Sequence, residues 1–179
     1  MICIAGKNEI AVFALQWLLK KGVPITSIVA CTNKTDNGEH GWQPSYKKIC
    51  ERLGVKIVSL DELYSIDNLL FISLEYDRLI KPGKFSTKRL FNIHFSNLPA
   101  YKGMYTSIWP LVNAESKGGV TLHYIDRGID TGDIIDHVEF DIPLHFNGLD
   151  LYKSYLRHSA VLFEKNIQAL LDENFTSFP

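Results

Sequence analysis

Hydrophobic and polar residues alternate strictly in one short stretch near the middle of the chain. Every second residue from Phe91 to Phe95 is apolar, and the residues between them are Asn92 and His94. A period of two predicts a β-strand with an apolar and a polar face. Asn92 and His94 therefore share a face, with Cα atoms roughly 6.5 Å apart at about 3.3 Å of rise per residue. Both side chains can then reach one small reacting group.

The first half of the chain alternates short apolar runs with amphipathic segments. The apolar runs predict strands at residues 1–5, 25–31, 55–60 and 69–73, and the amphipathic segments predict helices at residues 9–21 and 45–53. Asn8 is expected to cap the first helix. This order favours right-handed βαβ crossovers. The expected fold class is α/β, with a Rossmann-like, mainly parallel twisted sheet and helices on both faces.

Two more alternating stretches follow in the second half. Residues 120–125 and 134–142 each predict a strand, and hairpin-like pairing is expected between these last strands. Before them, Ser107 is expected to cap a helix that Gly118 and Gly119 end.

The last expected element is a long amphipathic helix. Apolar residues recur at steps of three and four from Leu149 to Leu170, and Asn147 with Asp150 forms a capping pattern. The chain has 179 residues, of which 46% are hydrophobic and 22% charged, an ordinary globular composition. We therefore expect one domain over residues 1–179.

Charge and cysteine content argue against several kinds of partner and site. The formal net charge is −1, and the basic residues are scattered, which argues against nucleic acid or an anionic membrane as a partner. No apolar stretch reaches the ~18 residues of a membrane span. Cys3, Cys31 and Cys50 lack metal or redox spacing, so we expect buried reduced thiols and no metal site. The expected location is the cytoplasm.

Candidate chemistry gathers at His94 and its neighbours. An imidazole can take a proton from an amine near neutral pH, and the Asn92 amide can donate to a developing oxyanion. Asp130, in the polar stretch 123–135, is expected to orient the ring and raise its pKa. The three side chains suit acyl transfer to an amine. The same spacing also fits a buried core histidine without a catalytic role.

Two further positions have alternative readings. Lys7 and Asn8 lie where a helix is expected to begin, and a free helix N-terminus favours a substrate phosphate, unless Asn8 only caps the helix. Trp42 lies in a polar loop over residues 32–45, where it can stack on a nucleobase or sugar, or pack the loop onto the core.

Two segments, NIHFSNLPAYKG (residues 92–103) and GVTLHYIDRGIDTGDII (residues 119–135), resemble the 10-formyltetrahydrofolate-dependent formyltransferases. That family shares an Asn-x-His strand, a Leu-Pro-x-x-x-Gly loop and an Asp-x-Gly-x-Asp-x-Gly segment. The matching residues here are Asn92 and His94; Leu98, Pro99 and Gly103; and Asp126, Gly128, Asp130 and Gly132. The resemblance covers nearly the whole chain, and it implies that Asn92, His94 and Asp130 are catalytic.

Within this family the sequence is most similar to the sugar N-formyltransferases, and the similarity lies at residues 6–12, 71–82 and 101–107. The resemblance implies transfer of a formyl group from 10-formyltetrahydrofolate to a dTDP-3-amino-3,6-dideoxyhexose, for O-antigen lipopolysaccharide or another surface polysaccharide. It implies folate contacts at Leu74, Tyr76, Asp77, Ile80, Gly103, Asp126 and Asp130. Lower weight is given to contacts with the nucleotide sugar, which we expect at Lys7, Asn8, Lys102 and Tyr105.

The resemblance also leaves alternatives. Formyltransferases for glycinamide ribonucleotide are expected to carry a glycine-rich loop where this chain has Gly6, Lys7 and Asn8, and those for methionyl-tRNA a second, basic domain. Sugar N-formyltransferases usually continue into a C-terminal extension that helps form a homodimer, and we expect this sequence, ending at Pro179, to lack it. A non-catalytic folate-binding remnant, or an enzyme for another amine, are therefore the competing readings.

Overall fold

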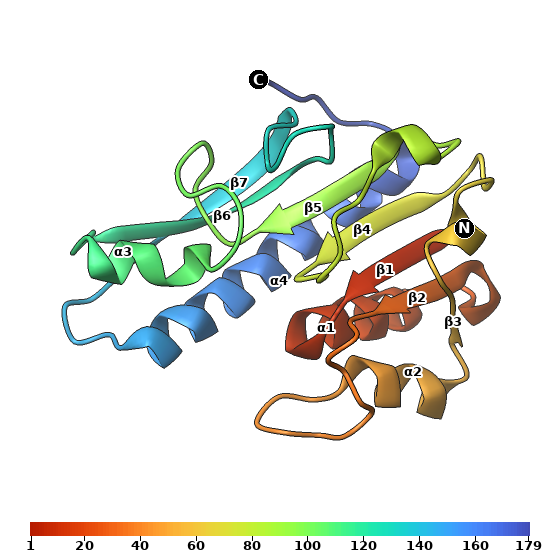
Figure 1. Cartoon of the computed structure of the whole chain (residues 1–179), viewed down its shortest axis with the longest axis horizontal. Helices are drawn as coiled ribbons and strands as arrows, with labels where there is room; N and C mark the ends of the chain where they lie inside the picture. The colour runs from red at the N-terminus through yellow and green to blue at the C-terminus, as the bar shows by residue number, and fades with distance from the viewer. The chain divides into compact units, whose positions relative to one another are not determined.

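The computed structural model describes residues 1–179 and divides into two compact units, Met1–Phe91 and Asn92–Pro179 (Figure 1). We call these the N-terminal and C-terminal units and describe each by itself. No helix in the structure is both long enough and apolar enough to cross a bilayer.

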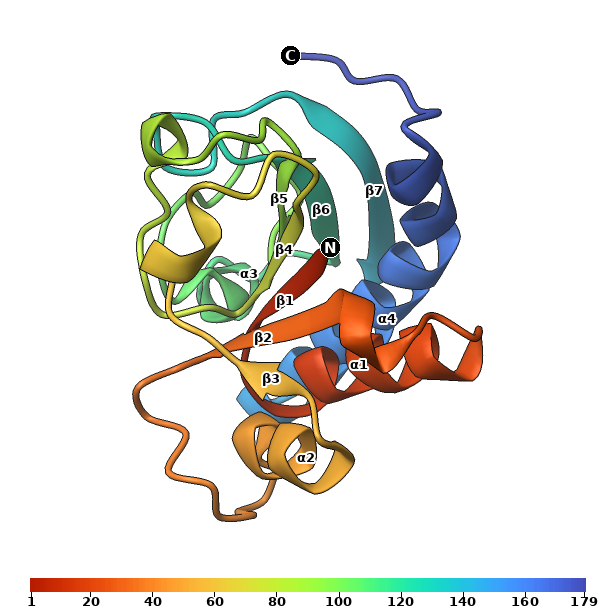
Figure 2. The same ribbon diagram turned by 90° about the vertical axis from the view of Figure 1, so that its right-hand side faces the viewer.

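The N-terminal unit is built on parallel strands, as predicted. Strand β1 pairs in parallel with both β2 and β4, and β2 pairs in parallel with β3. The helices α1 and α2 pack against these strands and against each other (Figure 2). The bounds of these elements are β1 Ile2–Gly6, α1 Asn8–Lys20, β2 Ile28–Thr32, α2 Tyr46–Leu53, β3 Lys56–Ile57 and β4 Leu70–Leu74, with 3₁₀ turns at Ile25–Ser27, Asp61–Leu63 and Pro82–Lys84.

Helix α2 begins and ends where local signals place it. The Ser45 hydroxyl accepts a hydrogen bond from the Lys48 amide at 3.0 Å, and Gly54 ends the helix at φ +74°. Glycine reaches such a φ without the steric cost that a Cβ imposes. Side-chain capping and a left-handed glycine are local in sequence, which is why the expected bounds of this helix are confirmed.

The prediction that Asn8 caps α1 is wrong. The N-cap is Lys7, whose side chain makes no capping hydrogen bond, and Asn8 is the first helical residue, at φ +57°. The Glu9 amide instead donates to Oε1 of Gln43, at 3.4 Å, from the loop after β2. The first turn of α1 therefore receives its acceptor from a residue distant in sequence, which no helix-start pattern can reveal.

The C-terminal unit holds an antiparallel hairpin covered by a long helix. Strands β6 and β7 pair antiparallel, as predicted, and α4 packs along both of them (Figure 2). Asn147 and Asp150 form the expected capping box at the start of α4. The bounds are β5 Leu90–His94, which straddles the two units, the 3₁₀ turn Thr106–Ile108, α3 Trp109–Val112, β6 Lys117–Tyr124, β7 Ile134–Asp141 and α4 Gly148–Asp172.

The expected helix between Ser107 and Gly118 is also wrong in its limits. Ile108, not Ser107, precedes α3, which ends at Val112. Both Gly118 and Gly119 lie inside β6, in close contact with neighbouring side chains. A Cβ on Gly118 would come within 2.8 Å of the Phe140 ring, and one on Gly119 within 2.8 Å of the Asn97 Cβ. These glycines therefore allow close packing in a strand rather than ending a helix.

Candidate active site

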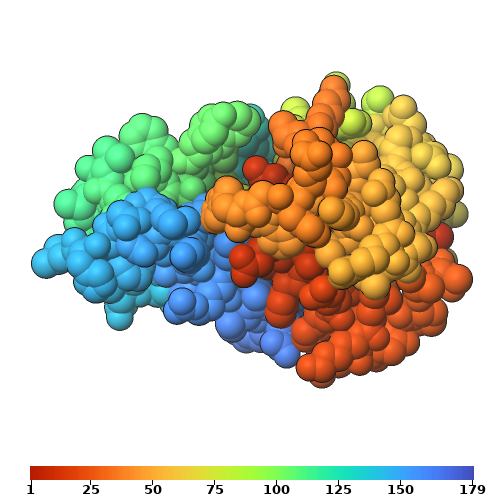
Figure 3. Space-filling model, turned by 90° about the horizontal axis from the view of Figure 1, so that it is seen from below, coloured from red at the N-terminus to blue at the C-terminus, as the bar shows by residue number.

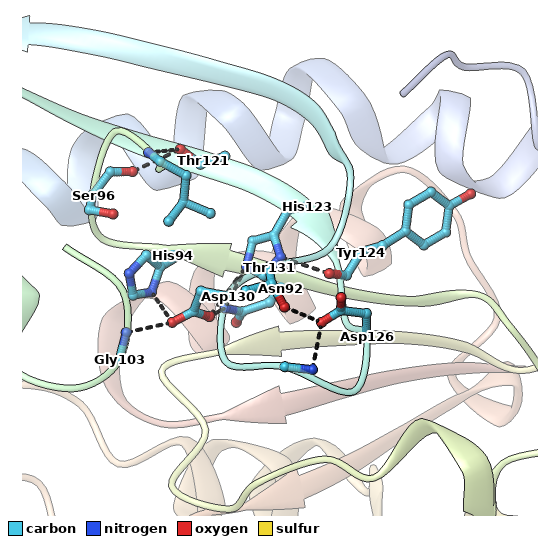
Figure 4. Close-up of polar contacts among 12 residues, drawn as sticks. Asn92, His94, Ser96, Gly103, Thr121, His123, Tyr124, Asp126, Asp130 and Thr131 are labelled. Carbon is cyan, nitrogen blue, oxygen red and sulfur yellow. Dashed lines mark hydrogen bonds and ion pairs between the residues drawn. The ribbon is translucent and has the colours of Figure 1, made fainter. Parts of the chain in front are cut away.

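The three side chains predicted as a catalytic group lie together in the C-terminal unit (Figure 4). Asn92 and His94 come from β5, and Asp130 from the loop between β6 and β7. The Asn92 Nδ2 atom is 3.4 Å from Asp130 Oδ1, and the His94 Nδ1 atom is 3.5 Å from Asp130 Oδ2. His94 is only 8% exposed. One carboxylate thus contacts both the amide and the imidazole, one through each oxygen.

The loop after β5 holds the imidazole and the carboxylate from another side. The His94 Nε2 atom lies 2.8 Å from the carbonyl oxygen of Tyr101, which can only accept, so Nε2 is the donor. The Gly103 amide donates to Asp130 Oδ2 at 2.8 Å. In a neutral ring, Nδ1 is then the basic nitrogen, and it faces Asp130.

The Asp-x-Gly-x-Asp-x-Gly segment forms a turn that is stabilised by hydrogen bonds between its own residues. Asp126 Oδ1 accepts from the Gly128 amide at 3.0 Å and from the Thr131 hydroxyl at 2.7 Å (Figure 4). A Cβ on Gly132 would lie 2.0 Å from the carbonyl oxygen of Tyr124. Asp126 and Gly132 therefore shape the loop that presents Asp130, and a folate contact for Asp126 stays a prediction.

Burial and charge set the protonation of the site. Burial lowers the pKa of His94, and its proximity to His123 lowers it further, whereas Asp130 and the Tyr101 carbonyl raise it; the net direction is downward. The predicted effect of Asp130, which raises this pKa, is present, but desolvation of the charged ring outweighs attraction to the carboxylate. For Asp130, burial raises the pKa, but contacts with His123, His94 and the Gly103 amide lower it more. Near pH 7, a neutral imidazole therefore lies beside an ionised carboxylate.

A residue that the sequence reasoning missed, His123, also belongs to this cluster. It lies on β6, is 2% exposed, and its Nε2 atom is 3.2 Å from Asn92 Nδ2. Its other ring nitrogen, Nδ1, is 2.7 Å from the carbonyl oxygen of Tyr124. The only sequence signal is its place inside the second family-like segment, because alternation within a strand says nothing about which strands are neighbours.

The predicted folate residues Leu74, Tyr76, Asp77 and Ile80 lie in the N-terminal unit, at and after the end of β4. Leu74 and Ile80 are buried. The Asp77 carboxylate accepts from the Lys34 amide at 2.8 Å, and its own amide donates to Asn33 Oδ1 at 3.2 Å. Asp77 thus joins the ends of two strands, and folate binding by these four residues stays a prediction.

The predicted substrate residues fall in separate places. Lys7 and Asn8 line a polar hollow of about 160 Å³ in the N-terminal unit, together with Asp36, Glu39 and Trp42. Trp42 is 70% exposed, so it does not pack the loop onto the core. Orange atoms of the loop after β2 and of α2 stand out from the surface in Figure 3. Lys102 and Tyr105 belong to the C-terminal unit, where both are exposed on the loop after β5.

The segments that hold the predicted catalytic residues lie within a match to a known protein family. A family model described as formyl transferase matches residues 69–162. The GDP-perosamine N-formyltransferase of Brucella melitensis is 31% identical in an alignment over 176 residues that covers 94% of this chain and 68% of that protein.

Two solved structures match almost the whole chain. WlaRD, a sugar 3N-formyl transferase crystallised with dTDP and 5-N-formyl-THF, is 48% identical, with a TM-score of 0.97 over 99% of this chain and 65% of that one. The Helicobacter canadensis N-formyltransferase, in complex with folinic acid and dTDP-3-aminofucose, is 44% identical, with a TM-score of 0.97 over 99% of this chain and 66% of that one. The chain thus spans about two thirds of each of these relatives. Together with the family match over more than half of its residues, these similarities show that the chain belongs to the formyl transferase family.

Proposed function

We propose that this chain transfers the formyl group of 10-formyltetrahydrofolate to the amine of a nucleotide-linked amino sugar. The observation that carries the proposal is the cluster of a buried neutral imidazole, an amide and an ionised carboxylate at His94, Asn92 and Asp130. Acyl transfer to an amine needs a proton acceptor and an oxyanion donor, and the cluster supplies both.

His94 acts as the proton acceptor. Its Nε2–H is committed to the Tyr101 carbonyl, so Nδ1 takes the proton that the attacking amine loses. The new carbon–nitrogen bond forms first on the formyl carbon and gives a tetrahedral intermediate. The bond from that carbon to the folate N10 then breaks, and the same proton passes to N10. An acid–base group of this kind contributes typically ~10²–10⁴-fold to rate.

Asp130 and Asn92 stabilise the charges that appear during transfer. The carboxylate lies 3.5 Å from His94 Nδ1, where it stabilises the imidazolium. The Asn92 amide donates to the oxygen of the tetrahedral intermediate, a contribution of about 10²–10³-fold for one such donor. The Gly103 amide donates to the same carboxylate at 2.8 Å, so a group of the chain itself holds Asp130 in place.

The folate is a co-substrate in this proposal, and the chain offers groups suited to it. We assign its contacts to Leu74, Tyr76, Asp77, Ile80, Gly103, Asp126 and Asp130. The carbonyl and amide groups of the loops around them can pair with the polar edge of a pterin. WlaRD and the Helicobacter canadensis protein, at 48% and 44% identity, were each solved with a folate derivative.

For the acceptor, we propose a dTDP-linked 3-amino-3,6-dideoxyhexose used in surface polysaccharide such as O-antigen. The hollow at Lys7 and Asn8 combines a cation and amides with the exposed indole of Trp42. An aromatic face suits a nucleobase, and a cation suits a phosphate. The dTDP ligands of the two solved relatives support this choice. Lys102 and Tyr105 are proposed to contact the sugar.

Other acceptors have less support. A tRNA substrate fits poorly because the net charge of −1 provides no basic surface for phosphates. Glycinamide ribonucleotide formyltransferases with TM-scores near 0.75 share the fold, but identities of about 20% say nothing about substrate. A cytoplasmic location belongs to the same proposal, since Cys3, Cys31 and Cys50 are all free. Formation of a homodimer stays a prediction.

A transfer assay tests the proposal. The purified chain is mixed with 10-formyltetrahydrofolate and each C4 epimer of the dTDP-3-amino-3,6-dideoxyhexose, and mass spectrometry follows a product heavier by one CO group. Formylated sugar is the expected result. Folate binding in a thermal-shift assay without any product would contradict the proposed acceptor and favour a folate-binding remnant or another amine. Absence of both binding and product would contradict the proposed reaction.

A further inference from the structure

His123 contacts two members of the catalytic cluster, yet the mechanism above gives it no task. Its Nε2 atom lies 3.2 Å from Asn92 Nδ2 and 3.5 Å from Asp130 Oδ1 (Figure 4). The pairing register of β6 and β7 shifts between Leu122 and His123. Irregularities of this kind often redirect a side chain beside an active site. The ring is 2% exposed, so it contacts the cluster rather than solvent.

The partners of the ring determine where its proton lies. The Tyr124 carbonyl can only accept, so Nδ1, 2.7 Å away, must carry a hydrogen. Asp130 Oδ1 is an ionised acceptor 3.4 Å from the Asn92 amide, so the end of the amide that faces it is the NH₂ group. Nε2 of His123 faces that same NH₂ group at 3.2 Å, so in the tautomer with its hydrogen on Nδ1 alone, Nε2 accepts from Asn92.

This arrangement orients the group that the reaction needs. The Asn92 NH₂ group contacts both His123 Nε2 and Asp130 Oδ1, and the contact with Asp130 is the longer of the two. Hydrogen bonds weaken at such lengths. The hydrogen near Asp130 is therefore the one that can turn toward a formyl oxygen, while His123 retains the other.

We propose that His123 is a positioning residue that keeps the NH₂ end of Asn92 directed at the reacting formyl group. This inference rests on the proposed formyl transfer for its kinetic consequences. Without the acceptor at Nε2, only the longer contact with Asp130 Oδ1 holds the Asn92 amide. The amide can then rotate more readily and present its oxygen to the developing oxyanion, where two oxygens repel. Removal of the acceptor should then cost part of what one oxyanion donor contributes.

Kinetics of His123→Leu and His123→Gln test this role. Leucine removes the acceptor at similar volume, whereas the Gln Oε1 atom reaches about as far as Nε2 and can accept from Asn92. We expect His123→Leu to lower kcat by about 10- to 100-fold, within the ~10²–10³-fold contribution of one donor. KM should stay within about threefold, and His123→Gln should recover most of kcat. Equal losses in the two variants would overturn the proposal.

A matched control separates this role from packing. His158 on α4 also directs Nδ1 at a backbone carbonyl, that of Ser154 at 2.7 Å, and stacks on Phe140. His158→Leu should leave kcat near the wild-type value. In an Asn92→Ala background, His123→Leu should cause no further loss, because residues acting through one group are not additive. A full additional loss in that background would mean that His123 acts independently of Asn92.

An NMR measurement on the wild-type chain needs no substrate at all. Long-range ¹⁵N–¹H spectra of the labelled protein at pH 7 should show His123 as the neutral tautomer with its proton on Nδ1. They should also show a slowly exchanging Asn92 NH₂ signal that shifts in His123→Leu. A ring protonated on Nε2 would refute the positioning role even if no acceptor amine is found. Absence of transfer with the expected tautomer would instead count against the proposed function.

Discussion

The Gly132→Ala substitution gives a sharp test of how the loop places Asp130. A Cβ at this position would lie 2.0 Å from the carbonyl oxygen of Tyr124, at the end of β6, whereas real Cβ contacts stay above 3.0 Å. The obstructing atoms are backbone, so the two segments must move apart by about 1 Å. Because Gly132 is two residues from Asp130, that displacement reaches the carboxylate contacting His94.

The size of the effect follows from this displacement. A misplacement of about 1 Å at a catalytic group can cost ~10²-fold in rate. Overpacking typically destabilises a fold by about 1–3 kcal/mol. We therefore expect Gly132→Ala to lower kcat roughly 100-fold while the protein still unfolds cooperatively, with a melting temperature lowered by several degrees.

Gly83→Ala is the matched control, because a Cβ there meets no heavy atom within 4 Å. Steady-state formylation kinetics and thermal unfolding are measured for both variants at a temperature where each is folded. Gly83→Ala should have wild-type kcat. Wild-type kcat in Gly132→Ala would refute the argument that close contact with β6 positions Asp130.

Four further outcomes follow from the same structure. His94→Ala should lower kcat by about 10²–10⁴-fold without weakening folate binding in a thermal-shift assay. Because the pKa of His94 is lowered, the formylation rate should persist below pH 6.5 and fall as pH decreases through that pKa, since a protonated ring cannot accept a proton from the amine. Asp130→Asn removes a charge that raises this pKa, so in that variant the fall in rate should move to lower pH. Trp42→Ala should raise KM for the nucleotide sugar about 5- to 160-fold with little change in kcat, since base stacking contributes ~1–3 kcal/mol. Asn147→Ala should reduce the free energy of unfolding by about 1 kcal/mol in a urea titration, through loss of the α4 cap, with kcat unchanged.

Elements specified by neighbouring residues could be predicted well. The capping box at Asn147 and the left-handed Gly54 each involve contacts within a few positions, so the starts and ends of α4 and α2 follow from local patterns. The alternation at residues 91–95 likewise placed Asn92 and His94 on one strand face. Pairing of β6 with β7 was predictable because the two strands follow each other directly, joined by the loop of residues 125–133.

Glycines and caps that serve contacts distant in sequence were misread. Gly118 looks like a helix stop in sequence, but its lack of a side chain makes room for Phe140. The start of α1 looks capped by Asn8, but Gln43 supplies the acceptor from another loop. In both cases the residue type was informative, and its partner was decided by packing.

The sequence by itself determined the strand face with Asn92 and His94, the mainly parallel α/β class and the family-like segments. Only the tertiary structure decided that Asp130 contacts both of them and that His123 joins the cluster. It also decided that burial lowers the pKa of His94 despite the nearby carboxylate. The physical reason is that periodicity encodes which way a side chain points along its own strand. Distance between strands and desolvation depend on the whole packed unit.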